Sequence, residues 1–158
     1  MSVLISPPRL LTALPAAACA ALLACGGVSP VPVEVSPLLG PGAGLEAHVE
    51  RYAASALRSH GVEAPSFTLV ADVRSGSASQ ASGTSAQAGA TRLQGRVTLS
   101  GPCAGQRVEA QASAETSFAL GADRGAAERA AAAALLERTI DDAVASWARR
   151  CEGGDGDT

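Results

Sequence analysis

The chain has 158 residues and a formal net charge of -3, and every basic residue is an arginine. This length allows one modest domain, and an acidic balance without a basic cluster argues against nucleic acid as a partner. With two Phe, one Trp and one Tyr, a core built mainly on Ala and Val buries little area, so we expect modest stability.

The first 24 residues have the layout of a bacterial signal peptide. Arg9 carries the sole side-chain charge among residues 1–33, and an apolar run extends from Leu10 to Ala24. The run contains Pro15 and is shorter than the roughly 20 apolar residues that a membrane-spanning helix needs. We therefore expect residues 1–24 to be removed on export.

The end of this run, Leu22-Leu23-Ala24-Cys25, resembles the lipobox of bacterial lipoproteins. That motif has Leu three positions before a cysteine and a small residue directly before it, although Leu23 is larger than the usual Ala or Ser. The resemblance implies cleavage before Cys25 and acylation of its thiol and amino group, so that lipid holds the protein on a membrane. Cys19 is a competing site with a poorer match, because Ala16 lies three positions before it.

The residue after the lipidated cysteine indicates which membrane a lipoprotein is sorted to. Gly26 stands where Asp retains a lipoprotein in the inner membrane, so the resemblance implies a lipid-anchored outer-membrane protein with its domain facing the periplasm. The alternative is ordinary signal cleavage, which would leave a soluble periplasmic protein.

Residues 25–44 predict a lipidated tether rich in Pro and Gly. Proline opposes helix formation and favours extended backbone. The alternation of Val31, Val33 and Val35 leaves open a short edge strand, in which Pro32 would have to face away from the ladder.

Residues 45–151 predict a small α+β domain. Apolar residues recur at helical spacing over Leu45–His60, and Gly61 with Val62 can close the helix with a Schellman-type cap. Three runs then alternate with period two, over residues 67–74, 92–99 and 107–120. Asp123 can cap a second helix over residues 123–150. The predicted fold is helix, three-stranded antiparallel sheet, helix, with both helices packed on one sheet face.

The connections are polar or rich in glycine. Residues 75–89 lack apolar periodicity and predict a mobile hairpin loop, and residues 101–105 predict a turn. Gly95 falls on the apolar face of its strand and indicates a bulge or a close approach. Residues 152–158 predict a disordered tail.

Cys103 and Cys151 are the pair with a physical argument for a disulfide. Cys151 extends the apolar stripe of the last helix, and Cys103 lies in the turn at the end of the sheet that this helix should cover. In an oxidising compartment a bridge over about 50 residues would stabilise the fold by roughly 4 kcal/mol. The alternative is two free thiols.

No motif indicates catalysis. His48 and His60 lie on the first predicted helix and are out of phase, and the sequence contains no nucleophile, zinc-protease or nucleotide-binding pattern. We therefore expect no catalytic, cofactor-binding or metal site.

Two classes of function fit these features. The first is a non-catalytic envelope lipoprotein that acts as an accessory or assembly factor through contact with an envelope protein. In element order, residues 45–150 resemble the LPS-assembly lipoprotein family (LptE). The second is a small periplasmic ligand-binding module or an enzyme, which would require a polar cluster in a pocket.

Overall fold

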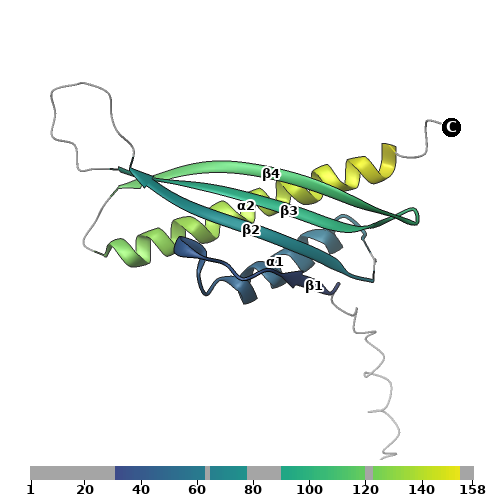
Figure 1. Cartoon of the computed structure of the whole chain (residues 1–158), viewed down its shortest axis with the longest axis horizontal. Helices are drawn as coiled ribbons and strands as arrows, with labels where there is room; N and C mark the ends of the chain where they lie inside the picture. The colour runs from purple at the N-terminus through teal and green to yellow at the C-terminus, as the bar shows by residue number, and fades with distance from the viewer. Residues whose placement is uncertain (1–30, 63–64, 78–89, 120–122, 154–158) are drawn as a thin grey trace, which may run out of the picture.

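The computed structural model describes residues 31–62, 65–77, 90–119 and 123–153. These residues form a two-layer α+β domain in which one sheet is covered on one side by two helices (Figure 1). In chain order the elements are β1 (Val33–Val35), the 3-10 turn η1 (Gly40–Gly42), α1 (Glu46–Ser59), β2 (Phe67–Ser77), β3 (Ala90–Cys103), β4 (Gln106–Ala119) and α2 (Arg124–Glu152).

The sheet has four strands in the order β1-β2-β3-β4 and is mixed. β1 runs parallel to β2, with Val33 opposite Phe67, whereas β2, β3 and β4 form an antiparallel meander. The three antiparallel strands and the two helices agree with the sequence prediction. The predicted sheet had three strands, whereas the observed sheet has four. The fourth is the edge strand that the valine alternation left open.

Proline is compatible with this edge position. Pro32 is exposed and has no N–H to donate, while its carbonyl accepts a hydrogen bond from Phe67 N at 2.9 Å. Residues 31–44, which the sequence analysis assigned to the tether, thus contribute β1 and η1 to the domain, and Val31, Val33 and Leu38 are buried in its core. Residues 1–30, including the predicted signal peptide and Cys25, lie outside the described residues.

Alternation along the strands separates a buried face from a polar one. Helix-facing positions such as Leu69, Leu93 and Leu99 are fully buried. α2 lies against β3 and β4, and α1 packs on α2 and β1. The largest fully buried side chains are Leu57, Phe67, Leu69, Leu93, Leu99, Leu136 and Ile140.

Two glycines let the layers approach closely. A Cβ on Gly95 would lie 3.0 Å from Leu135 Cγ, and the register of β3 runs through Gly95 without interruption, so this glycine marks a close approach rather than a bulge. A Cβ on Gly101 would overlap the ring of Phe67, which also meets Trp147 edge-on with ring centroids 5.0 Å apart.

The helix ends follow the predicted caps. Val62 N donates to Leu57 O at 3.1 Å and Gly61 N donates to Arg58 O at 2.9 Å, and Gly61 has a positive φ of 69°; these are the bonds of a Schellman cap. At the start of α2, the carboxylate of Asp123 accepts from Ala126 N at 3.0 Å.

The turn between β3 and β4 is tighter than predicted. The strands continue through residues 101–103, and the chain reverses at Ala104 and Gly105 alone. Both have positive φ, 48° and 81°, as a two-residue type I′ hairpin requires.

Candidate binding face of the sheet

The sheet face opposite the helices carries the polar half of the strand alternation. β2 contributes Thr68, Asp72 and Arg74 to it, and neither helix packs over these positions in the described part of the chain. The remaining side chains on this open face, all exposed or half-buried, are Val70, Arg92, Gln94, Arg96, Thr98, Ser100, Arg107, Glu109, Gln111, Ser113, Glu115 and Ser117.

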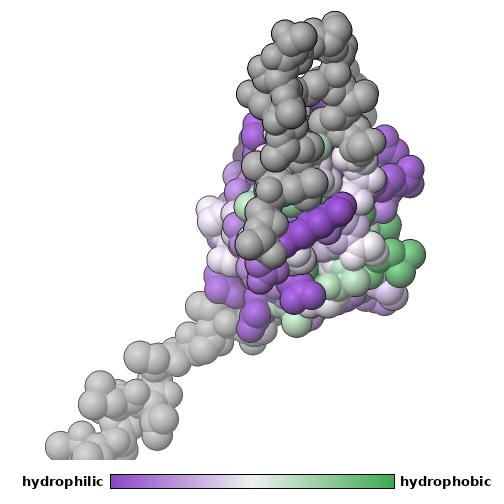
Figure 2. Space-filling model, turned by 90° about the vertical axis from the view of Figure 1, so that its left-hand side faces the viewer, coloured by the Kyte–Doolittle hydropathy of each residue, from purple (hydrophilic) through white to green (hydrophobic). Residues whose placement is uncertain are grey.

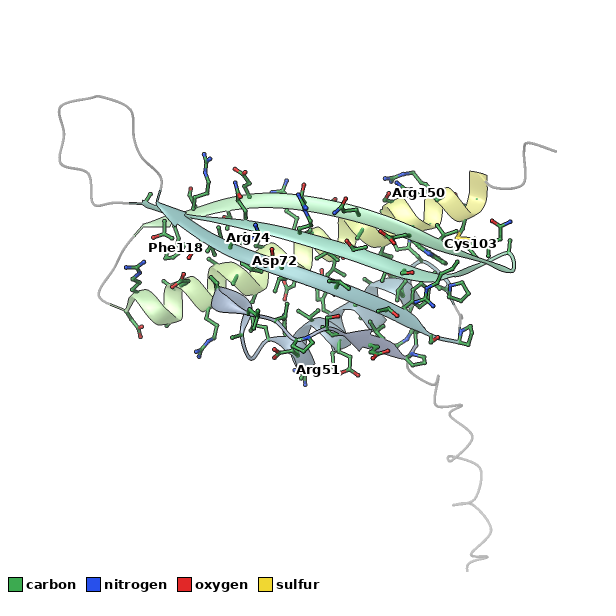
Figure 3. All side chains as sticks on the ribbon, viewed as in Figure 1. Arg51, Asp72, Arg74, Cys103, Phe118 and Arg150 are labelled. Atoms are coloured by element: carbon green, nitrogen blue, oxygen red, sulfur yellow. A yellow bond between two sulfur atoms is a disulfide. The ribbon has the colours of Figure 1, made fainter. Side chains whose placement is uncertain are left out.

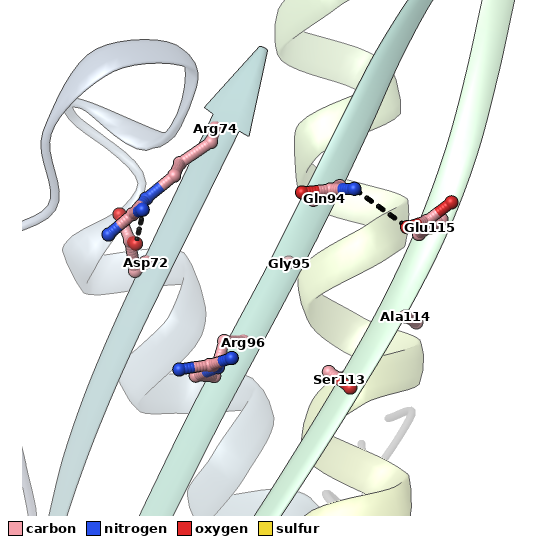
Figure 4. A pocket seen from close by; sticks show the side chains of 8 residues that line it. All are labelled: Asp72, Arg74, Gln94, Gly95, Arg96, Ser113, Ala114 and Glu115. Carbon is pink, nitrogen blue, oxygen red and sulfur yellow. Dashed lines mark hydrogen bonds and ion pairs between the residues drawn. The ribbon is translucent and has the colours of Figure 1, made fainter. Parts of the chain in front are cut away.

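A hollow of about 460 Å³ lies on this face, between the middle parts of β2, β3 and β4. Figure 4 shows the side chains around it, and Figure 3 places Asp72 and Arg74 on the middle of the sheet, away from the disulfide end. Its lining is Asp72, Arg74, Gln94, Gly95, Arg96, Ser113, Ala114 and Glu115.

Charged and amide groups pair along the rim of the hollow. Arg74 Nε donates to Asp72 Oδ2 at 2.7 Å, and Gln94 Nε2 donates to Glu115 Oε1 at 2.7 Å. Glu115 also lies 3.6 Å from Arg92 Nε through its other oxygen. Because these groups are exposed, water screens them, and each pair contributes little to stability.

Arg96 lines the hollow from β3, the middle of its three strands. The register places it opposite Asp72 on β2 and opposite Ser113 on β4, and its guanidinium makes no hydrogen bond or ion pair with another described residue. A guanidinium can hold a carboxylate or another oxyanion with two parallel hydrogen bonds. The hollow therefore offers donors and acceptors to a polar surface group.

A second arginine links the strands near the disulfide end of this face. Arg107 on β4 donates from Nε to Ser100 Oγ at 2.7 Å and from Nη2 to Thr68 Oγ1 at 2.8 Å, so it joins three strands.

Arg150 on α2 reaches the outer edge of β4 and donates to the carbonyl of Glu109.

The opposite side of the molecule has a polar contact between the helices. His48 Nε2 lies 2.8 Å from Glu137 Oε1, and Tyr52 donates from its hydroxyl to Asp141 Oδ2 at 2.8 Å. The hydrogen bond to the Asp141 carboxylate raises the pKa of Tyr52 above its ordinary value of 10.0, because it favours the neutral phenol. These pairs fix α1 on α2.

The predicted cysteine pair is joined. A disulfide links Cys103, at the end of β3, to Cys151, in the last turn of α2, with Cα atoms 5.7 Å apart. Among the described residues, no group of three or more His, Cys, Asp or Glu side chains is placed to hold a metal ion. His48 is engaged with Glu137, and His60 is the exposed residue that follows α1.

The hollow was not predicted from the sequence. Six of its eight lining residues are polar positions of the three alternating runs, and the other two, Gly95 and Ala114, fall on the apolar face. Alternation indicates a solvated face but not which residues of different strands are neighbours. That neighbourhood depends on the register, in which Arg74 faces Gln94 and Gln94 faces Glu115.

No family model matches the chain. No curated protein matches it either. Among solved structures, a presumed lipoprotein from Caulobacter crescentus is 19% identical, with a TM-score of 0.38, over 77% of this chain and 91% of that one. A minor lipoprotein from Acinetobacter baumannii is 15% identical, with a TM-score of 0.40, over 77% of this chain and 90% of that one.

A hypothetical protein from Chlamydia trachomatis is 11% identical, with a TM-score of 0.38, over 74% of this chain and 95% of that one. Since all three scores are below 0.5, these likenesses carry no conclusion about function. Within the described ranges, no helix is both long and apolar enough to cross a bilayer.

Proposed function

We propose that this protein is a lipid-anchored lipoprotein of the bacterial envelope that works by contact with another protein and not by catalysis. The observation that carries the proposal is the sequence Leu22-Leu23-Ala24-Cys25 at the end of a short apolar run. Lipidation of Cys25 would hold the domain at a membrane, and Gly26 in place of Asp favours the outer membrane.

The open sheet face is the contact surface in this proposal. It presents a hollow with paired charges at its rim and Arg96 in its lining, which suits a partner that offers a carboxylate or a polar backbone segment. An assembly role is also in keeping with the order of α1, β2, β3, β4 and α2, which resembles the order in the LPS-assembly lipoproteins. In this chain β1 comes before these elements.

The anchor is tested by metabolic labelling with a clickable palmitate analogue. We expect Cys25→Ala to abolish labelling and to release the protein from membranes, whereas Cys19→Ala should leave both unchanged. Labelling that persists in the Cys25 variant would refute the assignment.

The contact surface is tested by crosslinking the tagged protein in intact envelopes and identifying what is captured. We expect Arg96→Glu to remove the specific partner band, because it reverses the charge of a side chain that lines the hollow. Arg58→Glu, on the exposed side of α1, is the matched control and should retain the band. Equal capture by both variants would exclude the hollow from the contact.

The size of the hollow also favours a second candidate, a small-ligand module. Ligand pockets commonly measure roughly 300–1,000 Å³, although their lining is mostly apolar and this one is polar. The crosslinking experiment separates the two candidates. A protein that binds only a small ligand in the hollow should give no specific protein adduct at this face, in the wild type or in Arg96→Glu.

A further inference from the structure

The described domain begins very close to the predicted anchor. Five residues separate Cys25 from Val31, and Val31 is 8% exposed within the core beside β1. A trans chain advances at most about 3.6 Å per residue, so the Cα atoms of Cys25 and Val31 are at most about 22 Å apart. If Cys25 is lipidated, as proposed above, the start of β1 must lie next to the bilayer.

The segment that follows β1 has the composition of a membrane-contacting loop. Residues 36–45, which we call the β1 edge loop, contain no charged side chain. Pro37 and Pro41 have no backbone N–H, which lowers the cost of placing this loop at an apolar interface.

Within the β1 edge loop, two adjacent leucines point in opposite directions. Leu38 is 3% exposed and fixes the loop to the core, whereas Leu39 is 77% exposed, the larger value of the two exposed large hydrophobic residues in the described chain. The backbone around Leu39 is held by Ser36 N donating to Leu69 O at 3.0 Å and by Ala43 N donating to Gly40 O at 3.1 Å. The leucine is therefore presented on an ordered loop.

This loop and the start of the domain share one edge of the sheet. β1 is the edge strand, η1 contacts β2 beside it, and β4 forms the opposite edge. Figure 1 shows β1 along that edge, beside the start of β2, whereas η1 lies farther along β2, next to Val73. The end view of Figure 2 shows apolar surface gathered on one side of a largely hydrophilic outline.

We propose that the β1 edge loop seats on the lipid bilayer, with Leu39 entering the boundary between headgroups and acyl chains. The occupant is the membrane that holds Cys25, because the short reach brings that membrane to this edge and the loop has no charge to oppose burial. The arrangement directs the β4 edge away from the membrane and leaves the hollow on the open face accessible from the side.

The test uses the full lipidated protein reconstituted in phosphatidylcholine vesicles that contain brominated lipid, which quenches tryptophan on contact. Leu39→Trp reports the loop, and Gln111→Trp, exposed on β4 at the opposite edge, is the matched control. The wild-type signal of buried Trp147 is subtracted from both. Because Leu39 and Gln111 are both exposed, neither substitution should disturb folding, and circular dichroism checks this.

We expect strong quenching of Trp at position 39 and none at position 111. Equal and weak quenching at both positions, in protein that floats with the vesicles and carries the palmitate label, would overturn the seating while leaving the anchor intact. Protein that neither floats nor labels would overturn the anchor itself, and the seating with it.

Discussion

Gly101 lacks a Cβ, and this leaves the space in which the Phe67 ring packs against the sheet. A Cβ at this position would lie 2.1 Å from an atom of the Phe67 ring, which itself is 1% exposed and wedged against Trp147. Neither aromatic ring can move without disturbing the contact between the sheet and α2. The position therefore requires glycine for space and not for backbone freedom.

We expect Gly101→Ala to lower the free energy of unfolding by about 1–3 kcal/mol, the usual cost of overpacking a core. Urea denaturation followed by circular dichroism measures it. Gly76→Ala is the control, since nothing lies within 4 Å of a Cβ built there. If both variants unfold at the same urea concentration, the Phe67 ring has room to move away from the added methyl group, and position 101 does not require glycine.

Tyr52 offers a spectroscopic measure of the contact between the helices, because it is the one tyrosine in the sequence. Its pKa is raised by the hydrogen bond to Asp141, so the folded state holds the phenol proton more tightly than the unfolded state does. This stabilisation is fully present below pH 10 and is lost as the pH rises through the folded-state pKa.

Titration of the phenolate absorbance should therefore give a midpoint above 10.0 for the folded wild type. We expect Asp141→Asn to lower the midpoint, because the amide oxygen accepts the same hydrogen bond without the negative charge. Asp142→Asn, on the neighbouring exposed residue, should leave the midpoint nearly unchanged. Identical midpoints in wild type and Asp141→Asn would contradict the pairing.

Helix α2 is stabilised at both of its ends. Asp123 caps its first turn, and Cys151 ties its last turn to the end of β3. Both features could be predicted from the sequence, because a capping residue precedes the helix and Cys151 continues the stripe of Leu136, Ile140, Val144 and Trp147. Local spacing along a helix is enough to place residues on one face.

Removing the disulfide should destabilise the domain substantially. The cysteines are 48 positions apart, and closing a loop of that size restricts the unfolded chain by roughly 4 kcal/mol in the chain-entropy model. We expect Cys103→Ala and Cys151→Ala each to lower the free energy of unfolding by about 2–5 kcal/mol in unreduced protein. The double variant should match either single one, and a reductant should bring the wild type to the same value. An unaltered denaturation midpoint would show that the bridge does not stabilise the fold.

At the scale of the whole molecule, the domain needs residues that composition assigned to a tether. Val31, Val33 and Leu38 are 8%, 6% and 3% exposed, and β1 covers the edge of β2 at Phe67–Leu69. Without them the core is open on one side and β2 presents unpaired backbone groups, which favour aggregation.

We therefore expect a chain that starts at Val31 to fold cooperatively and a chain that starts at Leu45 to fail. Burial of each lost side chain contributes about 1.5–3 kcal/mol, and three of them together approach the whole stability of a small domain. Thermal unfolding and size-exclusion chromatography of the two truncated chains compare them directly. Equal melting temperatures would place the domain boundary at Leu45, as the composition alone suggested.

Five features can be predicted from the order of the amino acids alone: the two helices, the three long strands, the apolar face of each, the caps and the cysteine pair. These depend on spacing within one element or on a residue at its end, and such patterns can be read along the chain. The open polar face was likewise evident from alternation with period two.

The edge strand β1, the hollow and the need for glycine at position 101 depend instead on contacts between distant segments. The strand Val33–Val35 has three residues, which is too few for its alternation to predict a strand among four nearby prolines. It forms because its backbone can pair with β2. The hollow around Arg96 depends on which residues of three strands stand opposite one another, and Gly101 depends on a ring 34 positions earlier in the chain. Contacts between distant segments are fixed by register and packing, which no local pattern contains.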